Sequence, residues 1–336
     1  MQKDSEQGAA APIEARHWID GEWLRSARTG DSVDPATGRI IGRYHDGGAE
    51  EAELAIAAAA RAFEDDSWTA DPQRRAVALM RLADAYEARR EEVVATLCRE
   101  NGKLRHEAGF EAGLILRGLR FAAGLALQNF GRVMDPRPGF QGMSIVQPIG
   151  VAGLIIPWNS PAYLSIRALA PALAAGCTAA IKMPMQAAQT AALMSEILAS
   201  VPDLPRGAVN LFIESGAAGA KRLVDSPLVK TVSFTGSTGT GRAIARSRWP
   251  PPRSSSGSAS SWAGRRRTWC STMPISMRCC RCWRSPRRCS PGSSACAAAG
   301  SWFSAASPSA CARGWRRGCA RSGRARPPIP PATWGP

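Results

Sequence analysis

The sequence predicts an α/β fold in which a parallel sheet follows a helical N-terminal segment. Short apolar runs alternate with helical segments between residues 151 and 246, and long amphipathic stretches precede them. No apolar run reaches the 18 residues of a membrane span, which excludes a transmembrane helix. Composition changes abruptly near residue 248, so the fold prediction applies to residues 16–247.

The N-terminal part divides into a leader, a strand-rich segment and three helices. Residues 1–15 are polar and small, so we expect a flexible leader that is not a signal peptide. Residues 17–46 alternate apolar and polar side chains around two turn sequences, which predicts short strands. Apolar side chains at helical spacing predict helices over residues 49–63, 72–100 and 106–133. A break at 136–139 and a strand over 143–148 follow.

The remaining segments predict a parallel sheet with crossover helices. Apolar runs indicate strands over 151–157, 178–183, 208–213 and 230–235. Helices are expected over 161–175, 186–200, 217–224 and 238–246. Ligands bind beyond the carboxyl ends of such strands. The candidate site residues are therefore Pro157, Trp158, Asn159, Lys182, Gly216, Gly236 and Ser237.

Two of these positions fit a nucleotide phosphate or sugar. The turn at residues 234–241 joins a strand to a helix, and its glycines allow close backbone approach to a pyrophosphate. It matches neither the G-x-G-x-x-G nor the P-loop pattern, and an ordinary tight turn explains it equally well. Lys182 suits ribose hydroxyls or a phosphate, although a solvated strand-end charge is the commoner role.

The positions after the first strand and before the second also have two interpretations each. Asn159 suits a developing oxyanion, to which its amide would donate, but the N-cap of the next helix is its commoner role. Trp158 is more often a packing residue than a ligand contact. Cys177 lies in an apolar segment without a nearby base and is expected to be an inert core thiol.

Taken together, these segments resemble the aldehyde dehydrogenase superfamily over residues 16–246. The resemblance is most specific in Pro157-Trp158-Asn159 and Phe234-Thr235-Gly236-Ser237, in this order. Further matching blocks are Trp18–Trp23, Asp34–Gly38, Gln147–Gly153, Pro171–Gly176 and Ile181–Lys182. The resemblance implies a Rossmann-type cofactor domain, and NAD or NADP as the cofactor of an aldehyde oxidation.

Site roles follow from the resemblance position by position. It implies that Ile156, Pro157 and Trp158 line the cofactor cleft and that Lys182 binds the adenosine ribose. Gly236 and Ser237 would contact the pyrophosphate, and the Asn159 amide would support an oxyanion. The family commonly has a ribose-binding Glu three residues after the lysine, where this chain has Met185. The choice between NAD and NADP therefore stays open.

Residues 248–336 have a composition unlike that of a folded domain. They hold 16 of the 43 basic side chains, all arginine, none of the 27 acidic ones, and no Leu or Val. Residues 1–247 therefore carry 27 charges of each sign. Eight of the ten cysteines lie in this tail, but no repeated CxxC pair or histidine accompanies them, which disfavours zinc. We expect a disordered tail without a native fold.

A shifted reading frame accounts for this tail. In this shifted frame, each new codon consists of the third base of one codon and the first two bases of the next. Translated in this way, residues 259–280 permit the sequence LELGGKTPNLVFDDADLDAVL. The family's general-base Glu and nucleophilic Cys are absent from the chain as written. The shifted frame restores both motifs, from Ser260–Arg265 and Pro291–Ala295. Cys296 lies beside the restored motif only because of the shifted frame, and it is not a candidate for the catalytic nucleophile.

The sequence therefore predicts a member of this family, inactive as written, with an out-of-frame tail in place of its catalytic domain. The expected partner is a small aldehyde. The family is homo-oligomeric, but the terminal oligomerisation segment is expected to be missing here. Cys98 and Cys177 as the only thiols of residues 1–247 suit a reducing cytoplasm. The alternative is a non-catalytic nucleotide-binding remnant whose basic tail binds nucleic acid non-specifically, which nothing else in the sequence favours.

Overall fold

The computed structural model describes residues 13–128, 130–248 and 267–272. The described strands form three sheets: one of seven strands in the order β12-β11-β8-β9-β10-β2-β3, one of three in the order β1-β5-β4, and the hairpin β6-β7. The N-terminal strands are β1 (Ile13–Ala15), β2 (His17–Ile19), β3 (Glu22–Leu24), β4 (Thr29–Val33) and β5 (Ile40–His45).

A parallel core of five strands forms most of the large sheet: β8 (Val151–Ile155), β9 (Thr178–Pro184), β10 (Val209–Glu214), β11 (Val229–Gly236) and β12 (Arg267–Thr272). Strand β2 adds antiparallel to β10, and β3 continues from β2. The chain runs from β8 through β9 to β10 on one side and then returns to place β11 on the other side of β8. This reversal is the topological switch point of a doubly wound sheet.

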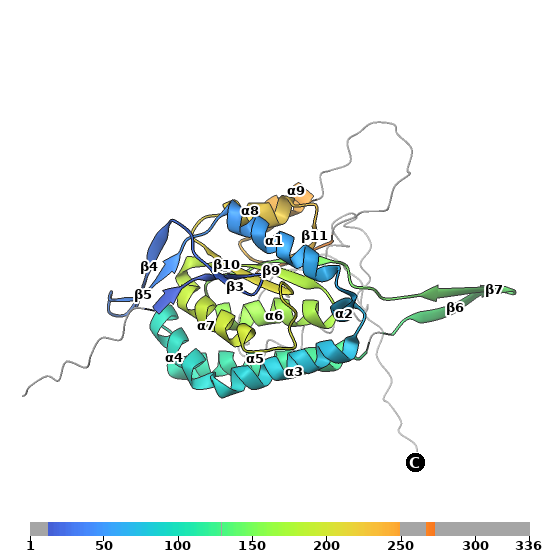
Figure 1. Cartoon of the computed structure of the whole chain (residues 1–336), viewed down its shortest axis with the longest axis horizontal. Coiled ribbons are helices and arrows are strands. Elements are labelled where there is room, and N and C mark those ends of the chain that lie inside the picture. Colours follow the sequence, from blue (N-terminus) through green and yellow to red (C-terminus); the bar gives the residue numbers. More distant parts are fainter. Residues whose placement is uncertain (1–12, 129, 249–266, 273–336) are drawn as a thin grey trace, which may run out of the picture. The chain divides into compact units, whose positions relative to one another are not determined.

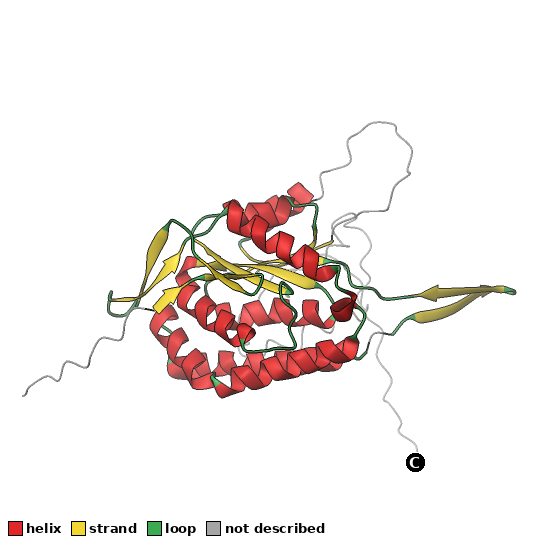
Figure 2. Ribbon diagram, in the orientation of Figure 1, coloured by secondary structure: helices red, strands yellow, loops and turns green. Residues whose placement is uncertain are grey.

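Helices cover both faces of this sheet (Figures 1 and 2). The connecting helices are α6 (Pro161–Ala174), α7 (Ala188–Ala199, after the short 3-10 turn Met185–Ala187), α8 (Ala218–Asp225) and α9 (Thr238–Arg248). Helices α6 and α7 lie on one face, and α8 and α9 lie on the other together with α1 (Ala49–Phe63). The expected α/β fold with a parallel sheet is thus confirmed.

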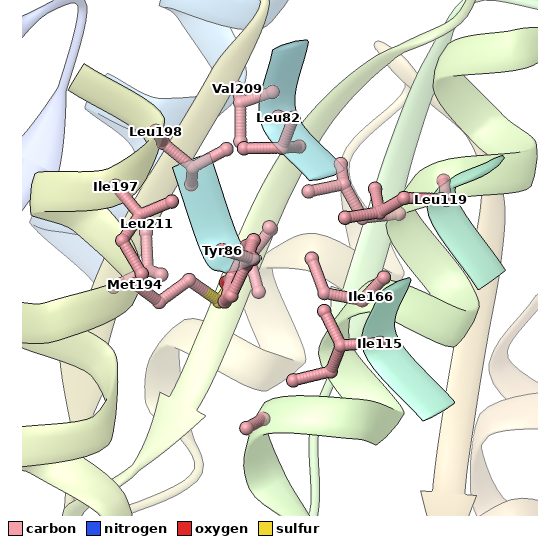
Figure 3. Close-up of a cluster of buried hydrophobic side chains, with 14 of the residues drawn as sticks. Leu82, Tyr86, Ile115, Leu119, Ile166, Met194, Ile197, Leu198, Val209 and Leu211 are labelled. Carbon is pink, nitrogen blue, oxygen red and sulfur yellow. The ribbon is translucent and has the colours of Figure 1, made fainter. Parts of the chain in front are cut away.

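A helical layer packs outside α6 and α7 and contains α3 (Pro72–Ala88), α4 (Arg90–Asn101) and α5 (Arg105–Ala126), with the short α2 (Asp66–Thr69) before it. Leu82, Ile115 and Ile166 are among the fully buried side chains of this core (Figure 3). Each such fully buried aliphatic side chain contributes about 1.5–3 kcal/mol. The layer starts sharply, because Pro72 opens α3 and the Asp71 carboxylate accepts the backbone N–H groups of the first turn.

The helical layer differs from the sequence prediction at two places. The helix expected over residues 72–100 is divided at Arg89, whose N–H bonds to Ala85 and Glu87 as α3 ends and α4 begins. The helix expected over 106–133 ends at Ala126 instead. The chain then forms the hairpin of β6 (Arg132–Arg137) and β7 (Phe140–Ser144), which reaches outward from the helices and the large sheet (Figure 1). The break expected at 136–139 is the turn of this hairpin, and the strand expected over 143–148 ends at Ser144.

The two ends of the described region also differ from expectation. Ile13–Ala15, expected within the leader, pair with β5 as a parallel strand. Arg248 is the last residue of α9, and its guanidinium donates to the backbone oxygens of Val224 and Val229. Residues 267–272 pair in parallel with β11, although we expected no native structure after residue 247. Residues 1–12, 249–266 and 273–336 lie outside the described residues, together with the expectations that concern them. In the described part of the chain, no helix is long and apolar enough to cross a membrane.

Candidate nucleotide-binding site

The predicted site residues meet at one edge of the large sheet. Lys182 lies in register with Ile155 of β8 on one side and Phe212 of β10 on the other, and Ile155 pairs in turn with Phe234 of β11. The segments that follow these strands therefore leave the sheet at the same level. The loops after β8 and after β11 flank the switch point, which is where ligands bind in doubly wound folds.

The loop after β8 carries four of the predicted residues. Ile156 is buried, and its N–H donates to the Lys182 carbonyl at 3.1 Å, which fastens the loop to β9. Pro157 is half-buried, whereas Trp158 is 59% exposed and Asn159 is exposed. The expectation that Trp158 is a packing residue is therefore not met, since its indole lies open to a ligand or to solvent.

Residues of the outer helical layer fix this loop by hydrogen bonds. Asn101 at the end of α4 donates its amide to the Trp158 carbonyl at 2.9 Å. Lys103 bonds to Ser160 at 3.2 Å and to the buried carboxylate of Glu111, which also accepts the Tyr163 N–H at 3.0 Å. These contacts place the loop on a rigid support, which a site that binds a developing charge requires.

Asn159 is not the N-cap of α6, although that was its commoner expected role. Ser160 occupies the N-cap position and makes no side-chain capping bond. Among the described residues, none forms a hydrogen bond with Asn159. Its amide is exposed and open to a ligand.

Lys182 occupies a half-buried position in the sheet rather than a freely solvated one. Burial lowers the pKa of its ammonium, and the negative charges of Glu214 and Asp46 oppose that decrease. Alternation along β9 and β10 places Lys182, Phe212 and Glu214 on one face of the sheet, the face that α1 and α8 cover. Lys182 forms no ion pair with the carboxylates of the described residues.

Gly236 ends β11, and Ser237 caps α9. The Ser237 hydroxyl accepts the Thr240 N–H at 3.2 Å, and the Ser237 carbonyl accepts the Gly241 N–H at 3.0 Å. The turn thus has the local structure of an ordinary helix start. A helix start also presents free N–H groups to an anion, so the geometry accommodates both interpretations of this segment.

Cys98 and Cys177 are not placed for nucleophilic chemistry. Cys177 is buried, and burial raises the pKa of its thiol, which fits the expected inert core residue. Cys98 is half-buried on α4. The positions of the shifted-frame motifs, Ser260–Arg265 and Pro291–Ala295, and Cys296 lie outside the described residues. Within the described part of the chain, no group of His, Cys, Asp or Glu side chains is arranged to hold a metal ion.

The sequence prediction missed the acidic side chains next to Lys182. It marked Gly216 as the residue after β10, but the strand continues to Glu214, whose carboxylate accepts the Gly219 N–H at 2.7 Å. Asp46, from the segment after β5, accepts the N–H and hydroxyl of Ser215. Glu214 could have been identified from the sequence, because it is an acidic residue at the end of an apolar run. No nearby sequence pattern identifies Asp46 as a neighbour of this site.

An ammonium, an exposed amide and a helix start around the switch point of a parallel sheet define the class of doubly wound nucleotide-binding proteins. The sequence model of the aldehyde dehydrogenase family matches residues 23–250. The chain belongs to the aldehyde dehydrogenase family.

Relatives and solved structures agree with this membership. The chain is 37% identical over 232 residues to 2-aminomuconic semialdehyde dehydrogenase of Danio rerio, covering 68% of this chain and 47% of the relative. It is also 37% identical over 235 residues to succinate-semialdehyde dehydrogenase [NADP(+)] 2 of Schizosaccharomyces pombe, covering 68% and 47%. A betaine aldehyde dehydrogenase double mutant of Staphylococcus aureus, solved with NAD+, is similar with a TM-score of 0.67 at 31% identity, covering 70% of this chain and 48% of that one. The chain spans about half the length of these proteins.

Proposed function

We propose that residues 16–247 are the cofactor-binding part of an NAD- or NADP-dependent aldehyde dehydrogenase, which oxidises an aldehyde to a carboxylic acid. One observation carries this proposal: the loop 156–159, Lys182 and the Gly236-Ser237 turn lie together at the switch point of a sheet in a member of this family. The donor set fits a dinucleotide, since an ammonium donates to ribose hydroxyls and a helix start binds phosphate.

Each side chain has a distinct task in this proposal. Lys182 holds the adenosine ribose, Gly236 and Ser237 contact the pyrophosphate, and Ile156, Pro157 and Trp158 line the cleft. A bound nicotinamide cofactor supplies the hydride acceptor. The Asn159 amide donates to the oxygen that becomes negative when a cysteine thiolate attacks the aldehyde and forms a thiohemiacetal. The nucleophilic Cys and the general-base Glu are the groups that this chain lacks as written.

We further propose that residues 248–336 are an out-of-frame translation of the catalytic domain and that the chain as written is inactive. Support comes from the tail's composition and from the motifs that the shifted frame restores. Without a thiolate and a base, no cofactor cleft completes the oxidation and the hydrolysis of the thioester.

Sequencing the gene across codons 240–265, followed by an assay of two proteins, tests this proposal. We expect the 336-residue chain to form no NADH or NADPH with a panel of aldehydes, and the frame-restored chain to form it. Aldehyde-dependent activity of the 336-residue chain would contradict the proposed inactivity. An inactive frame-restored chain that folds would contradict the proposed enzyme.

The same two proteins address the remaining expectations. Sixteen arginines without acidic neighbours would bind nucleic acid non-specifically, so RNA retention at low salt by the 336-residue chain alone would favour the alternative of a nucleotide-binding remnant with a basic tail. We expect no such retention. For the frame-restored chain we propose a small aldehyde as substrate, homo-oligomeric assembly and a cytoplasmic location, which kinetics, ultracentrifugation and cell fractionation can check.

A further inference from the structure

Two carboxylates from different segments of the chain, Glu214 and Asp46, lie near enough to Lys182 to act on its charge. Glu214 ends the neighbouring strand β10, on the same face of the sheet as Lys182 and two residues beyond its register partner Phe212. Asp46 follows β5, and the Gly47 N–H next to it donates to the Ile213 carbonyl at 2.9 Å, which fastens this segment to β10. Both carboxylates act on the Lys182 ammonium by their charge.

The Glu214 carboxylate is fixed where it stands. One of its oxygens accepts the Gly219 N–H at 2.7 Å and the other accepts the Ala220 N–H at 3.2 Å, both in the first turn of α8. The residue is 1% exposed. Its charge is therefore poorly screened by solvent and cannot swing away from a ligand that lies over Lys182.

Asp46 is held almost as firmly. The Ser215 N–H and hydroxyl donate to its two oxygens at 2.7 and 2.8 Å, and the exposed guanidinium of Arg28 lies 3.4 Å away. The cations of α8 are engaged elsewhere, since Lys221 pairs with Asp225 and Arg222 pairs with Glu53. Apart from Lys182 itself, the charges named here are two buried or fixed carboxylates against one exposed guanidinium.

Position 185 contributes no charge to this cluster. Met185 packs against the core, and its sulfur accepts the Tyr44 hydroxyl at 3.2 Å. A carboxylate at such a site normally favours a ribose with a free 2′-hydroxyl, whereas a 2′-phosphate needs an arginine or a similar cation. Here the carboxylates come from the neighbouring strand β10 and from the segment after β5.

We propose that Glu214 and Asp46, acting on a ligand bound at Lys182, make this site select a dinucleotide with a free ribose 2′-hydroxyl over one with a 2′-phosphate. This inference rests on the proposed function, because it requires that Lys182 faces the adenosine ribose. Glu214 acts through its charge and not by direct contact, so discrimination comes from repulsion of the phosphate dianion. We expect a preference for NAD+ over NADP+ of about tenfold.

Isothermal titration of the full 336-residue chain with NAD+ and with NADP+ at pH 8 measures this preference. Glu214→Gln removes the charge and leaves one oxygen to accept an α8 amide, so we expect the ratio of the two Kd values to approach one. Asp46→Asn keeps partners for the Ser215 N–H and hydroxyl, and it provides a second variant that lowers the ratio. Glu100→Gln is the matched control, because Glu100 caps the neighbouring helix α7 but does not act on Lys182.

The outcomes separate the two proposals. Binding of neither dinucleotide by a chain that melts cooperatively would overturn the proposed function, and this inference with it. Equal Kd values for NAD+ and NADP+ in the unaltered chain would overturn the inference and leave the proposed function standing. A preference for NAD+ that stays unchanged in both Glu214→Gln and Asp46→Asn would also overturn the inference. The inference would likewise fail if Glu100→Gln lost this preference to the same extent as those two variants.

Discussion

Among single residues, Glu100 has the clearest energetic consequence. Its buried carboxylate accepts the backbone N–H groups of Gln189 and Thr190 and the Thr190 hydroxyl, all at the start of α7. Burial raises its pKa to about 7, because these hydrogen bonds compensate only part of the lost hydration. Glu100 is therefore a helix cap whose charged form the fold disfavours.

This pKa predicts a specific pH dependence of stability. Between the pH 4.5 at which an exposed glutamate titrates and pH 7, the folded chain holds a proton on Glu100 that the unfolded chain has lost. The contribution of Glu100 to the free energy of unfolding therefore decreases as pH rises through this window, by about 3 kcal/mol in total. Urea denaturation of Glu100→Gln at pH 5 and pH 7.5 should lack this decrease.

Two comparisons make that measurement decisive. His17 is buried and its pKa is lowered to about 4, so its contribution increases with pH between 4 and 6.5 and offsets that of Glu100 in the unaltered chain. Glu100→Gln should therefore gain stability with pH more steeply than the parent. The exposed Glu50 offers a control, because Glu50→Gln should follow the parent. Identical pH profiles for Glu100→Gln and the parent would show that Glu100 titrates normally.

Some site residues could be predicted one by one and others could not. Lys182 and Gly236 follow from the sequence because each stands at the end of an apolar run, and strand ends of a parallel sheet share one edge. Asp46 lies far from Lys182 in the chain and is held near it by the contacts of Asp46 with Ser215 and of residue 47 with β10. Such a juxtaposition is a product of tertiary structure, which local patterns do not contain.

Among the elements, α8 packs very closely against two of its neighbours. A Cβ added at Gly219 would lie 2.7 Å from the Gly48 carbonyl oxygen and 2.6 Å from the Phe212 ring. The absence of a side chain thus lets α8 approach α1 and β10 closely enough for its first turn to reach the Glu214 carboxylate. The close approach and the position of the carboxylate depend on one another.

We expect Gly219→Ala to lower the free energy of unfolding by about 1–3 kcal/mol, because a backbone oxygen must move to admit the methyl group. Urea denaturation measures this change. Gly118 is the matched control: it also lies in a helix, but a Cβ there meets nothing within 4 Å. Gly118→Ala should therefore raise stability by about 0.5–1 kcal/mol. A Gly219→Ala variant as stable as the parent would mean that α8 packs more loosely than described.

The accuracy of the sequence prediction also varied between elements for physical reasons. The strands and helices between residues 151 and 248 were located to within one or two residues, because buried strands are short apolar runs with clear ends. The division at Arg89 was missed because no Pro or Gly marks it. A local ion pair of Arg89 with Glu92 and a tertiary ion pair with Glu196 accompany it. The β6-β7 hairpin was predicted as the end of a helix at Val133, a break over 136–139 and a strand over 143–148, because the apolar spacing of the preceding helix continues to Val133.

In the described molecule as a whole, stability is concentrated on the two sides of the large sheet. Buried side chains of α3, α5, α6 and α7 form one core with the sheet, and those of α1, α8 and α9 form the other. Arg75 of α3 links the outer helical layer to α6, since its buried guanidinium donates to the carbonyls of Trp68, Thr69 and Ala174. Opening the face that α6 covers would expose this charge together with apolar surface. Because both cores also share the strands of the large sheet, we expect them to unfold in one step.

The β6-β7 hairpin shares in neither core, and this makes it the point where a protease should first enter residues 13–248. Its two strands pair with each other, and Phe140, beside the turn at Gly139, is 53% exposed. Dilute chymotrypsin should cut after Phe140 before it reaches any buried aromatic residue of α3 or β10, as mass spectrometry of early digests would show. A cut that appears in the 336-residue chain and not in the frame-restored protein would show that the polypeptide added by the restored frame, or an assembly it allows, shelters the hairpin.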